Sequence, residues 1–119
     1  MTDRIDINRY LPLTEATFYI LLALDEPLHG YGVMQKVEAI SQGTVRLGPG
    51  TLYGAFQSLE KEGLIRMIRE EERRKCYQLT GKGRQALAAQ IGRLRVMLAN
   101  GQALHDGMSS SPAAGRSQE

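Results

Sequence analysis

The sequence has 119 residues, of which 42% are hydrophobic, with one cysteine and a formal net charge of +2. This length suits a single domain, and the hydrophobic content excludes a wholly disordered chain. The sequence has neither a run of about 18 apolar residues nor a secretory signal, and Cys76 alone cannot form an internal disulfide, so we expect a cytoplasmic protein.

Charge is unevenly distributed along the chain. Residues 1–63 contain five Lys and Arg against eight Asp and Glu, which gives a net charge of −3. Residues 64–119 contain ten basic and five acidic side chains, which gives a net charge of +5. Most of the basic excess lies in residues 64–95, and such a concentration is typical of a segment that contacts nucleic-acid phosphates.

The first helix is predicted after a lead-in that covers residues 1–13. Thr14 is a good N-cap, and residues 16–24 are densely apolar, so we expect this helix to be the most buried element. Asp25-Glu26-Pro27 ends it.

A second helix is predicted after a tight connection over residues 28–32, and it runs to about Ser41. Its apolar side consists of Val33, Val37 and Ile40. We interpret His29, in the connection, as a structural turn residue, because no Cys or His lies near it at metal-ligand spacing.

Residues 47–63 predict a glycine-proline loop and a third helix that Gly63 ends. Its apolar stripe consists of Leu52, Ala55, Phe56 and Leu59. The opposite face is small, polar and low in charge, with Gly50, Tyr53, Gly54, Gln57 and Lys61 on or near it and Thr51 at the N-terminal tip. Such a face suits a groove of duplex DNA, where small residues allow close approach and polar groups reach phosphates and bases. The alternative is an ordinary amphipathic helix with a solvated surface.

A basic β-hairpin is predicted next. Residues 64–69 and 75–79 alternate between apolar and polar, and residues 70–74 join them. Three helices followed by a basic hairpin is the order of a winged helix-turn-helix, in which the hairpin forms the wing. The alternative role for Arg73, Arg74 and Lys75 is a solvated strand edge that discourages pairing with other strands.

A fourth helix, capped by Thr80, is predicted over residues 80–105. Leu87, Ile91, Leu94 and Leu98 follow one another at spacings of four, three and four, which is the pattern of a coiled-coil seam. We favour pairing of this seam with a second copy of the chain, and the alternative is that the helix folds back onto its own domain. Residues 106–119 are rich in Gly, Ser, Pro and Gln and are expected to be disordered.

Several short stretches carry a resemblance to a known family. They are Leu13-Thr14-Glu15-Ala16, Leu28-His29-Gly30-Tyr31, Gly50-Thr51-Leu52-Tyr53, Leu59-Glu60-Lys61-Glu62-Gly63-Leu64-Ile65, Arg73-Arg74-Lys75-Cys76-Tyr77-Gln78-Leu79-Thr80 and Gly83-Arg84-Gln85-Ala86-Leu87. In this order and spacing, over residues 13–98, the sequence resembles the PadR family of bacterial transcriptional regulators. It departs from many members at Gly54, where they have proline, and it has no Trp, so binding of flat drugs between tryptophans is not carried over.

The resemblance implies a mainly α fold with a small β-hairpin: a winged helix-turn-helix domain over residues 14–79, followed by a dimerisation helix of the short-arm type. It also implies a homodimeric repressor that binds a palindromic operator in the cytoplasm, at the bacterial nucleoid. We expect a small apolar or aromatic effector to release it, and the candidate pocket residues are Phe18, Tyr19 and Leu94, which are otherwise ordinary core.

DNA contacts are expected from eight residues: Gly50, Thr51, Tyr53, Gln57, Lys61, Arg73, Arg74 and Lys75. We expect no metal, cofactor or membrane contact, and no catalysis, because the two histidines and one cysteine form no catalytic motif. The alternative function is a winged-helix module that binds proteins and has lost DNA binding.

Overall fold

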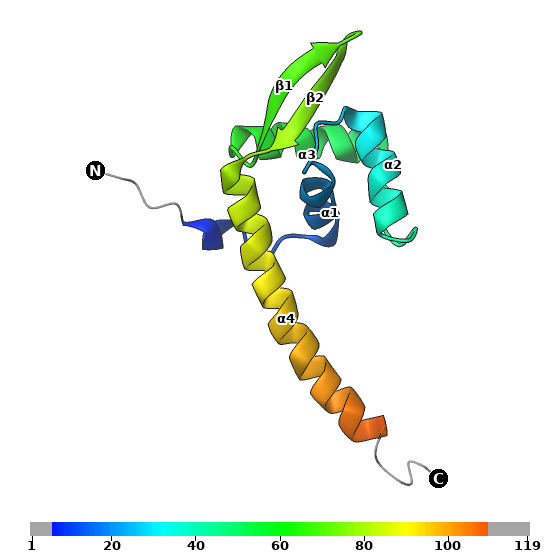
Figure 1. Cartoon of the computed structure of the whole chain (residues 1–119), viewed down its shortest axis with the longest axis vertical. Helices are drawn as coiled ribbons and strands as arrows, with labels where there is room; N and C mark the ends of the chain where they lie inside the picture. Colours follow the sequence, from blue (N-terminus) through cyan, green and yellow to red (C-terminus); the bar gives the residue numbers. More distant parts are fainter. Residues whose placement is uncertain (1–5, 110–119) are drawn as a thin grey trace, which may run out of the picture.

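The computed structural model describes residues 6–109 (Figure 1). The elements in chain order are the 3₁₀ turn η1 (Ile7–Tyr10), α1 (Glu15–Ala23), α2 (Gly30–Ile40), α3 (Pro49–Lys61), β1 (Ile65–Glu71), β2 (Arg74–Leu79) and α4 (Gly81–Ser109). Four helices and one antiparallel hairpin confirm the predicted mainly α class with a small β-hairpin. Within the described range, no helix combines the length and the apolar character needed to cross a bilayer.

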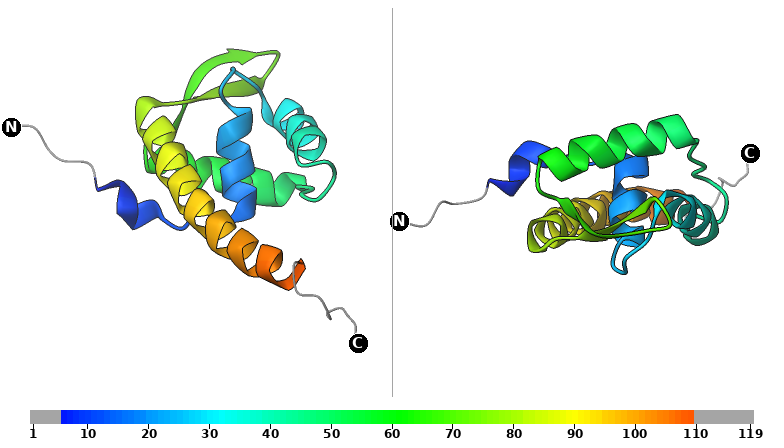
Figure 2. Two further views of the ribbon diagram at one scale, coloured as in Figure 1. Left: turned by 60° about the horizontal axis from the view of Figure 1, so that its bottom comes forward. Right: turned by 90° about the horizontal axis from the view of Figure 1, so that it is seen from above.

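Helix α1 lies between α2 and α4 and forms the centre of the core (Figure 2). The hydroxyl oxygen of Thr14 accepts a hydrogen bond of 3.0 Å from the N–H of Thr17, so Thr14 is the predicted N-cap. The side chains that α1 and its C-cap bury completely are Ile20, Leu21, Ala23 and Leu24. Three of the nine residues of α1 are buried, against three of the six residues of β2, which corrects the expectation that the first helix is the most buried element.

Helix α2 begins earlier than predicted, inside the segment 28–32 that was expected to be a connection. The reason is His29, whose ring Nδ1 accepts a hydrogen bond of 3.5 Å from the N–H of Gly32 and caps the helix. Val33 and Val37 are buried as predicted, whereas Ile40 is 41% exposed because the helix ends there at the surface.

Lys36 fastens α2 to the end of α1. Its ammonium donates hydrogen bonds to the Asp25 carboxylate at 2.8 Å, the Glu26 carboxylate at 2.7 Å and the carbonyl oxygen of Ala23 at 3.0 Å. The hydrogen bond from Lys36 lowers the pKa of Asp25 below its ordinary value. Burial opposes the charged form of Lys36, but its hydrogen bonds to both carboxylates raise its pKa overall.

Helix α3 starts at Pro49, two residues before the predicted tip at Thr51. Proline is favoured at the first helical position because its fixed φ suits the helix and its missing N–H would have had no partner there. The buried stripe is as predicted, with Leu52, Phe56 and Leu59 in the core. Gly63, at φ +78°, provides the positive angle that ends the helix.

The hairpin has longer strands and a tighter turn than predicted. Pairing extends from Ile65 opposite Leu79 to Glu71 opposite Arg74, so only two residues form the turn instead of the expected segment 70–74. Those residues, Glu72 and Arg73, have φ angles of 49° and 67°, and positive angles at both positions are the mark of a type I′ hairpin turn.

The base of the hairpin is built into the core. Leu28 pairs with Tyr77 through backbone hydrogen bonds of 3.1 and 3.0 Å, so the chain before α2 lies along the outer edge of β2. Because β2 contacts both α2 and α4, Cys76 and Tyr77 are both buried although they point to opposite faces. On β1 the register shifts between Met67 and Arg69, which interrupts the predicted alternation.

A single residue, Thr80, separates β2 from α4. Its hydroxyl donates to the carbonyl oxygen of Gly63 at 2.7 Å and accepts from the N–H of Gly83 at 3.0 Å, so it caps α4 as predicted. The helix runs to Ser109, which places residues 106–109 in a helix and corrects the expected end at residue 105. The remainder of the expected disordered tail, residues 110–119, lies outside the described residues.

The first turns of α4 pack on the domain, and its second half extends away from every other element (Figures 1 and 2). Leu87 is only 7% exposed and belongs to the core of its own chain, which corrects its assignment to an intermolecular seam. Ile91 is half-buried, whereas Leu94 and Leu98 are exposed. The side chain of Gln90 accepts a hydrogen bond of 2.8 Å from the N–H of Leu13 and fastens the lead-in to α4.

Candidate nucleic-acid interface

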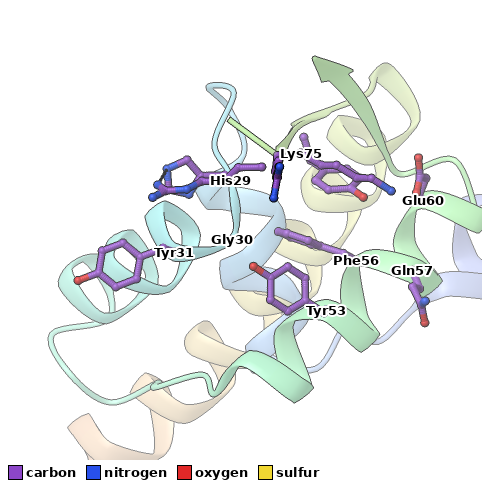
Figure 3. A pocket seen from close by; sticks show the side chains of 11 residues that line it. His29, Gly30, Tyr31, Tyr53, Phe56, Gln57, Glu60 and Lys75 are labelled. Carbon is purple, nitrogen blue, oxygen red and sulfur yellow. Dashed lines mark hydrogen bonds between the residues drawn. The ribbon is translucent and has the colours of Figure 1, made fainter. Parts of the chain in front are cut away.

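A groove of about 740 Å³ opens between α3, the wing and the start of α2 (Figure 3). Helix α3 contributes Tyr53, Gln57 and Glu60 to it. The wing contributes Arg73, Arg74 and Lys75, and the start of α2 contributes His29, Gly30 and Tyr31. Its walls therefore combine aromatic, amide and cationic groups, which are the side chains that reach bases and phosphates in duplex DNA.

Tyr53 projects into this groove from a buried aromatic support. Its ring packs edge-on against Phe56, with centroids 5.9 Å apart, and Phe56 in turn packs against Tyr77 at 4.7 Å. Phe56 is 2% exposed, whereas Tyr53 is 52% exposed. Phe56 thus supports the Tyr53 ring on its buried side, and the rest of the ring stays accessible to solvent.

Tyr77 forms part of the groove floor, with Phe56. Burial raises the pKa of the Tyr77 hydroxyl, and the negative charge of Glu60 raises it further. The hydroxyl therefore stays protonated and neutral at physiological pH, and it adds no negative charge to the groove.

The basic residues of the wing are all exposed. A guanidinium nitrogen of Arg74, Nη1, lies 3.2 Å from Nε2 of His29. This contact connects the tip of the wing to the N-cap of α2, across 45 residues of sequence.

The groove brings together five of the eight predicted DNA-binding residues. These are Tyr53, Gln57, Arg73, Arg74 and Lys75. The other three, Gly50, Thr51 and Lys61, lie on exposed positions of α3 outside the groove.

Sequence reasoning missed three groove residues with polar side chains: His29, Tyr31 and Glu60. Glu60 follows Tyr53 by seven residues, about two helical turns, so its place on the polar face could have been read from the periodicity. The contact of His29 with the wing had no comparable signal, because it depends on the tertiary fold.

A second groove, of about 510 Å³, lies between the start of α1 and the middle of α4. It brings together the three candidate effector-pocket residues, Phe18, Tyr19 and Leu94. Met97 adds to its mainly apolar wall, and the polar side chains that line it are Glu15, Gln90 and Arg93. Among the described residues, no group of three or more His, Cys, Asp or Glu side chains is placed to hold a metal ion.

Comparison with known proteins identifies relatives of this fold. Residues 20–89, more than half of the chain, match the model of the transcriptional regulator PadR-like family. An uncharacterized 37.1 kDa protein in transposon Tn4556 of Streptomyces fradiae is 43% identical over 74 residues, which are 61% of this chain and 21% of that protein. The chain thus spans about a fifth of that relative's length.

Solved structures share the fold over most of the chain. A transcriptional regulator from Clostridium thermocellum is 25% identical, with a TM-score of 0.60 over 78% of this chain and 91% of that one. A PadR family transcription regulator from hypervirulent Clostridium difficile R20291 is 22% identical, with a TM-score of 0.63 over 74% of this chain and 95% of that one.

Proposed function

This chain belongs to the PadR-like family of transcriptional regulators, and from that premise we propose that two copies bind a palindromic operator as a repressor. Each copy presents the exposed face of α3 to the major groove and the wing to the neighbouring backbone. Such a regulator acts on chromosomal DNA in the bacterial cytoplasm, and a small apolar or aromatic effector releases it.

The observation that carries this proposal is the groove that Tyr53 and Gln57 of α3 line together with the cations of the wing. Gln57 is exposed on α3 and has the bidentate amide that can pair with N6 and N7 of adenine. Tyr53 can contact a sugar or a thymine methyl group and donate to a phosphate. Arg73, Arg74 and Lys75 supply the charge that neutralises the backbone, and Gly50, Thr51 and Lys61 extend the contact along α3.

The second half of α4 supports the homodimer. Its side chains include exposed large apolar residues, Leu94, Val96, Met97, Leu98 and Leu104. At about 100° per residue, Leu94, Met97, Leu98 and Leu104 fall on one side of α4. An exposed apolar side of this kind marks a protein interface, and the same helix of a second copy is the simplest partner. Two copies would present their α3 helices about 34–36 Å apart, one turn of B-DNA.

The groove lined by Phe18, Tyr19 and Leu94 supports the effector part of the proposal. It touches both α1, in the centre of the DNA-binding domain, and α4, the proposed dimer helix. An apolar ligand bound there would contact both elements, so it could favour one relative arrangement of the two DNA-binding domains over another.

Selection of duplexes from a random library by the purified full chain tests the proposal. We expect recovery of a sequence with two inverted half-sites centred about 10 base pairs apart, and binding that weakens steeply between roughly 50 and 200 mM salt. Enrichment of no sequence would contradict an operator. Failure to bind any duplex even at low salt would favour the alternative, a winged-helix module that binds proteins.

A further inference from the structure

The imidazole of His29 stands between two hydrogen-bond donors. On one side, the N–H of Gly32 donates to Nδ1 at 3.5 Å. On the other, Nη1 of Arg74 lies 3.2 Å from Nε2. A guanidinium has donors only, so both ring nitrogens face a group that requires an acceptor.

No protonation state of His29 can satisfy both contacts. A neutral imidazole has one N–H and one acceptor nitrogen, and a protonated imidazole has two N–H groups and no acceptor. Each neutral tautomer leaves one donor unsatisfied: if Nε2 accepts from Arg74, the N–H of Nδ1 meets the N–H of Gly32, and if Nδ1 accepts from Gly32, the N–H of Nε2 meets the N–H of Arg74. In the second tautomer, which caps α2, one acceptor atom is missing between His29 and Arg74.

We propose that His29 and Arg74 form a clamp for one phosphate group of the DNA backbone, which supplies this missing acceptor. A phosphate oxygen between the two side chains accepts from Nε2–H of His29 and from the guanidinium of Arg74. Nδ1 is then left to accept from Gly32 and to cap α2. The inference rests on the proposed function and adds His29 to the residues that contact DNA.

The surroundings of the pair suit an anion. His29 and Arg74 line the same groove as Lys75 and Tyr53, so a second cation and a phenolic hydroxyl are close (Figure 3). Arg74 is exposed and can swing toward a phosphate, whereas His29 is half-buried and fixed by its place at the start of α2. The acidic side chain that lines the groove, Glu60, comes from the second half of α3.

Two substitutions at one position separate the clamp from the helix cap. In His29→Asn, the side-chain oxygen replaces Nδ1, and Asn is a strongly preferred N-cap residue, but the group corresponding to Nε2 is gone. In His29→Gln, the longer amide can still donate where Nε2 does, but it is a poor N-cap. A structural role for His29 predicts that Gln is the harmful substitution, and the clamp predicts that Asn is.

The affinity test uses the full chain and a fluorescent duplex selected by the wild-type protein. We expect His29→Asn to weaken binding about tenfold, the loss of one hydrogen bond to a charged group, without lowering the thermal midpoint. His29→Gln should bind within about threefold of wild type. In the Arg74→Ala background, His29→Asn should weaken binding by a much smaller factor, because the clamp has already lost its second arm. Arg84→Ala, on the exposed start of α4 and outside the proposed dimer surface, is the control for loss of one positive charge.

The tautomer of His29, measured by NMR on ¹⁵N-labelled imidazole, gives a second readout. We expect the proton on Nε2 in the complex with DNA, and the same shift toward that tautomer when inorganic phosphate is added to the free protein. A complex in which Nδ1 carries the proton, or a His29→Asn variant that binds as tightly as wild type, would overturn the clamp.

The two proposals fail in different ways. If wild type binds no duplex, the proposed function fails, and the phosphate titration then decides the clamp by itself. If wild type binds DNA normally and His29→Asn changes nothing, only the clamp fails.

Discussion

The hydroxyl end of Tyr53 occupies the space that a side chain on Gly30 would fill. A Cβ atom at Gly30 would lie 2.5 Å from Oη of Tyr53 and 2.8 Å from its Cζ. The first residue of α2 must therefore be glycine if the Tyr53 ring is to stay against Phe56 and face the groove. This contact makes Gly30 a determinant of how α3 presents its aromatic side chain.

Replacing Tyr53 by Ala should weaken operator binding by about 1–3 kcal/mol, because the substitution would remove the proposed base or sugar contact and the proposed phosphate hydrogen bond. Fluorescence anisotropy at fixed salt measures the change. Since Tyr53 is half-exposed, the free energy of unfolding should change less than the binding energy. If the variant binds the operator as tightly as wild type, Tyr53 does not contribute to the DNA interface.

Gly30→Ala should reduce DNA affinity by displacing the Tyr53 ring. The loss should approach that of Tyr53→Ala, while the fold stays intact because the obstructing atom is the free end of a side chain. The control is the double variant: in the Tyr53→Ala background, Gly30→Ala should have almost no further effect on binding. Additive losses would mean that Gly30 acts through something other than Tyr53.

Lys75→Ala should weaken binding to all duplexes by a similar factor, because this exposed wing lysine is proposed to contact phosphate and to read no base. The slope of log affinity against log salt should fall in magnitude by about 1. Arg84→Ala removes one positive charge outside both the groove and the proposed dimer surface, and it should leave the slope unchanged. A loss confined to the operator sequence would show that Lys75 contacts a base.

Gly83→Ala should destabilise the fold by about 1–3 kcal/mol or more, because the new methyl group would overlap the carbonyl oxygen of Leu64 and lie 2.6 Å from Cδ1 of Leu79. Gly81 is a matched control in the same helical turn, since a Cβ there meets nothing within 4 Å. Gly81→Ala should be neutral or stabilising by up to about 1 kcal/mol. Urea unfolding of the two variants makes the comparison, and equal stabilities would contradict the close packing of α4 on the hairpin.

Leu94→Glu combined with Leu98→Glu should convert the proposed dimer into a folded monomer, because charge would enter the exposed apolar surface of α4. Sedimentation measures the mass, and circular dichroism checks that the fold remains. Leu87→Ala provides the contrast, because truncating this buried side chain should lower the stability of each chain by about 2–5 kcal/mol. A double variant that stays dimeric would place the interface elsewhere.

Lys36→Met should lower stability by about 1 kcal/mol near pH 6, the upper range for exposed ion pairs. The pKa of Asp25 in the folded protein lies below its ordinary 3.8, so the pair stabilises the fold above about pH 4. That contribution is lost as the pH falls through the folded-state pKa of Asp25. The difference between wild type and variant in urea unfolding should therefore narrow from pH 6 to pH 3, and a constant difference would contradict the ion pair.

Local signals predicted much of this fold. The caps Thr14 and Thr80 and the buried stripe of α3 depend on residues a few positions apart, and the structure confirms them. The tight turn was missed because Glu72 and Arg73 take the positive angles that normally require Gly or Asn.

Contacts between distant segments could not be read in this way. Leu87 fits a seam and a core equally well by its spacing, and only the tertiary packing assigns it to the core. The pairing of Leu28 with Tyr77 and the contact of His29 with Arg74 each join segments more than forty residues apart. The wing side of the candidate interface depends on such contacts.

The single-residue junction at Thr80 makes α4 a lever for the wing. The backbone N–H of Thr80 donates a hydrogen bond of 3.1 Å to the carbonyl oxygen of Leu64, and its hydroxyl forms hydrogen bonds with Gly63 and Gly83. With 29 residues, α4 is about 43 Å long, so a tilt of about 5° at this pivot moves its far end by about 4 Å. Because only Thr80 separates β2 from α4, no longer linker absorbs this movement. A force on the C-terminal end of α4 would therefore move the wing, which carries Arg73 and Arg74.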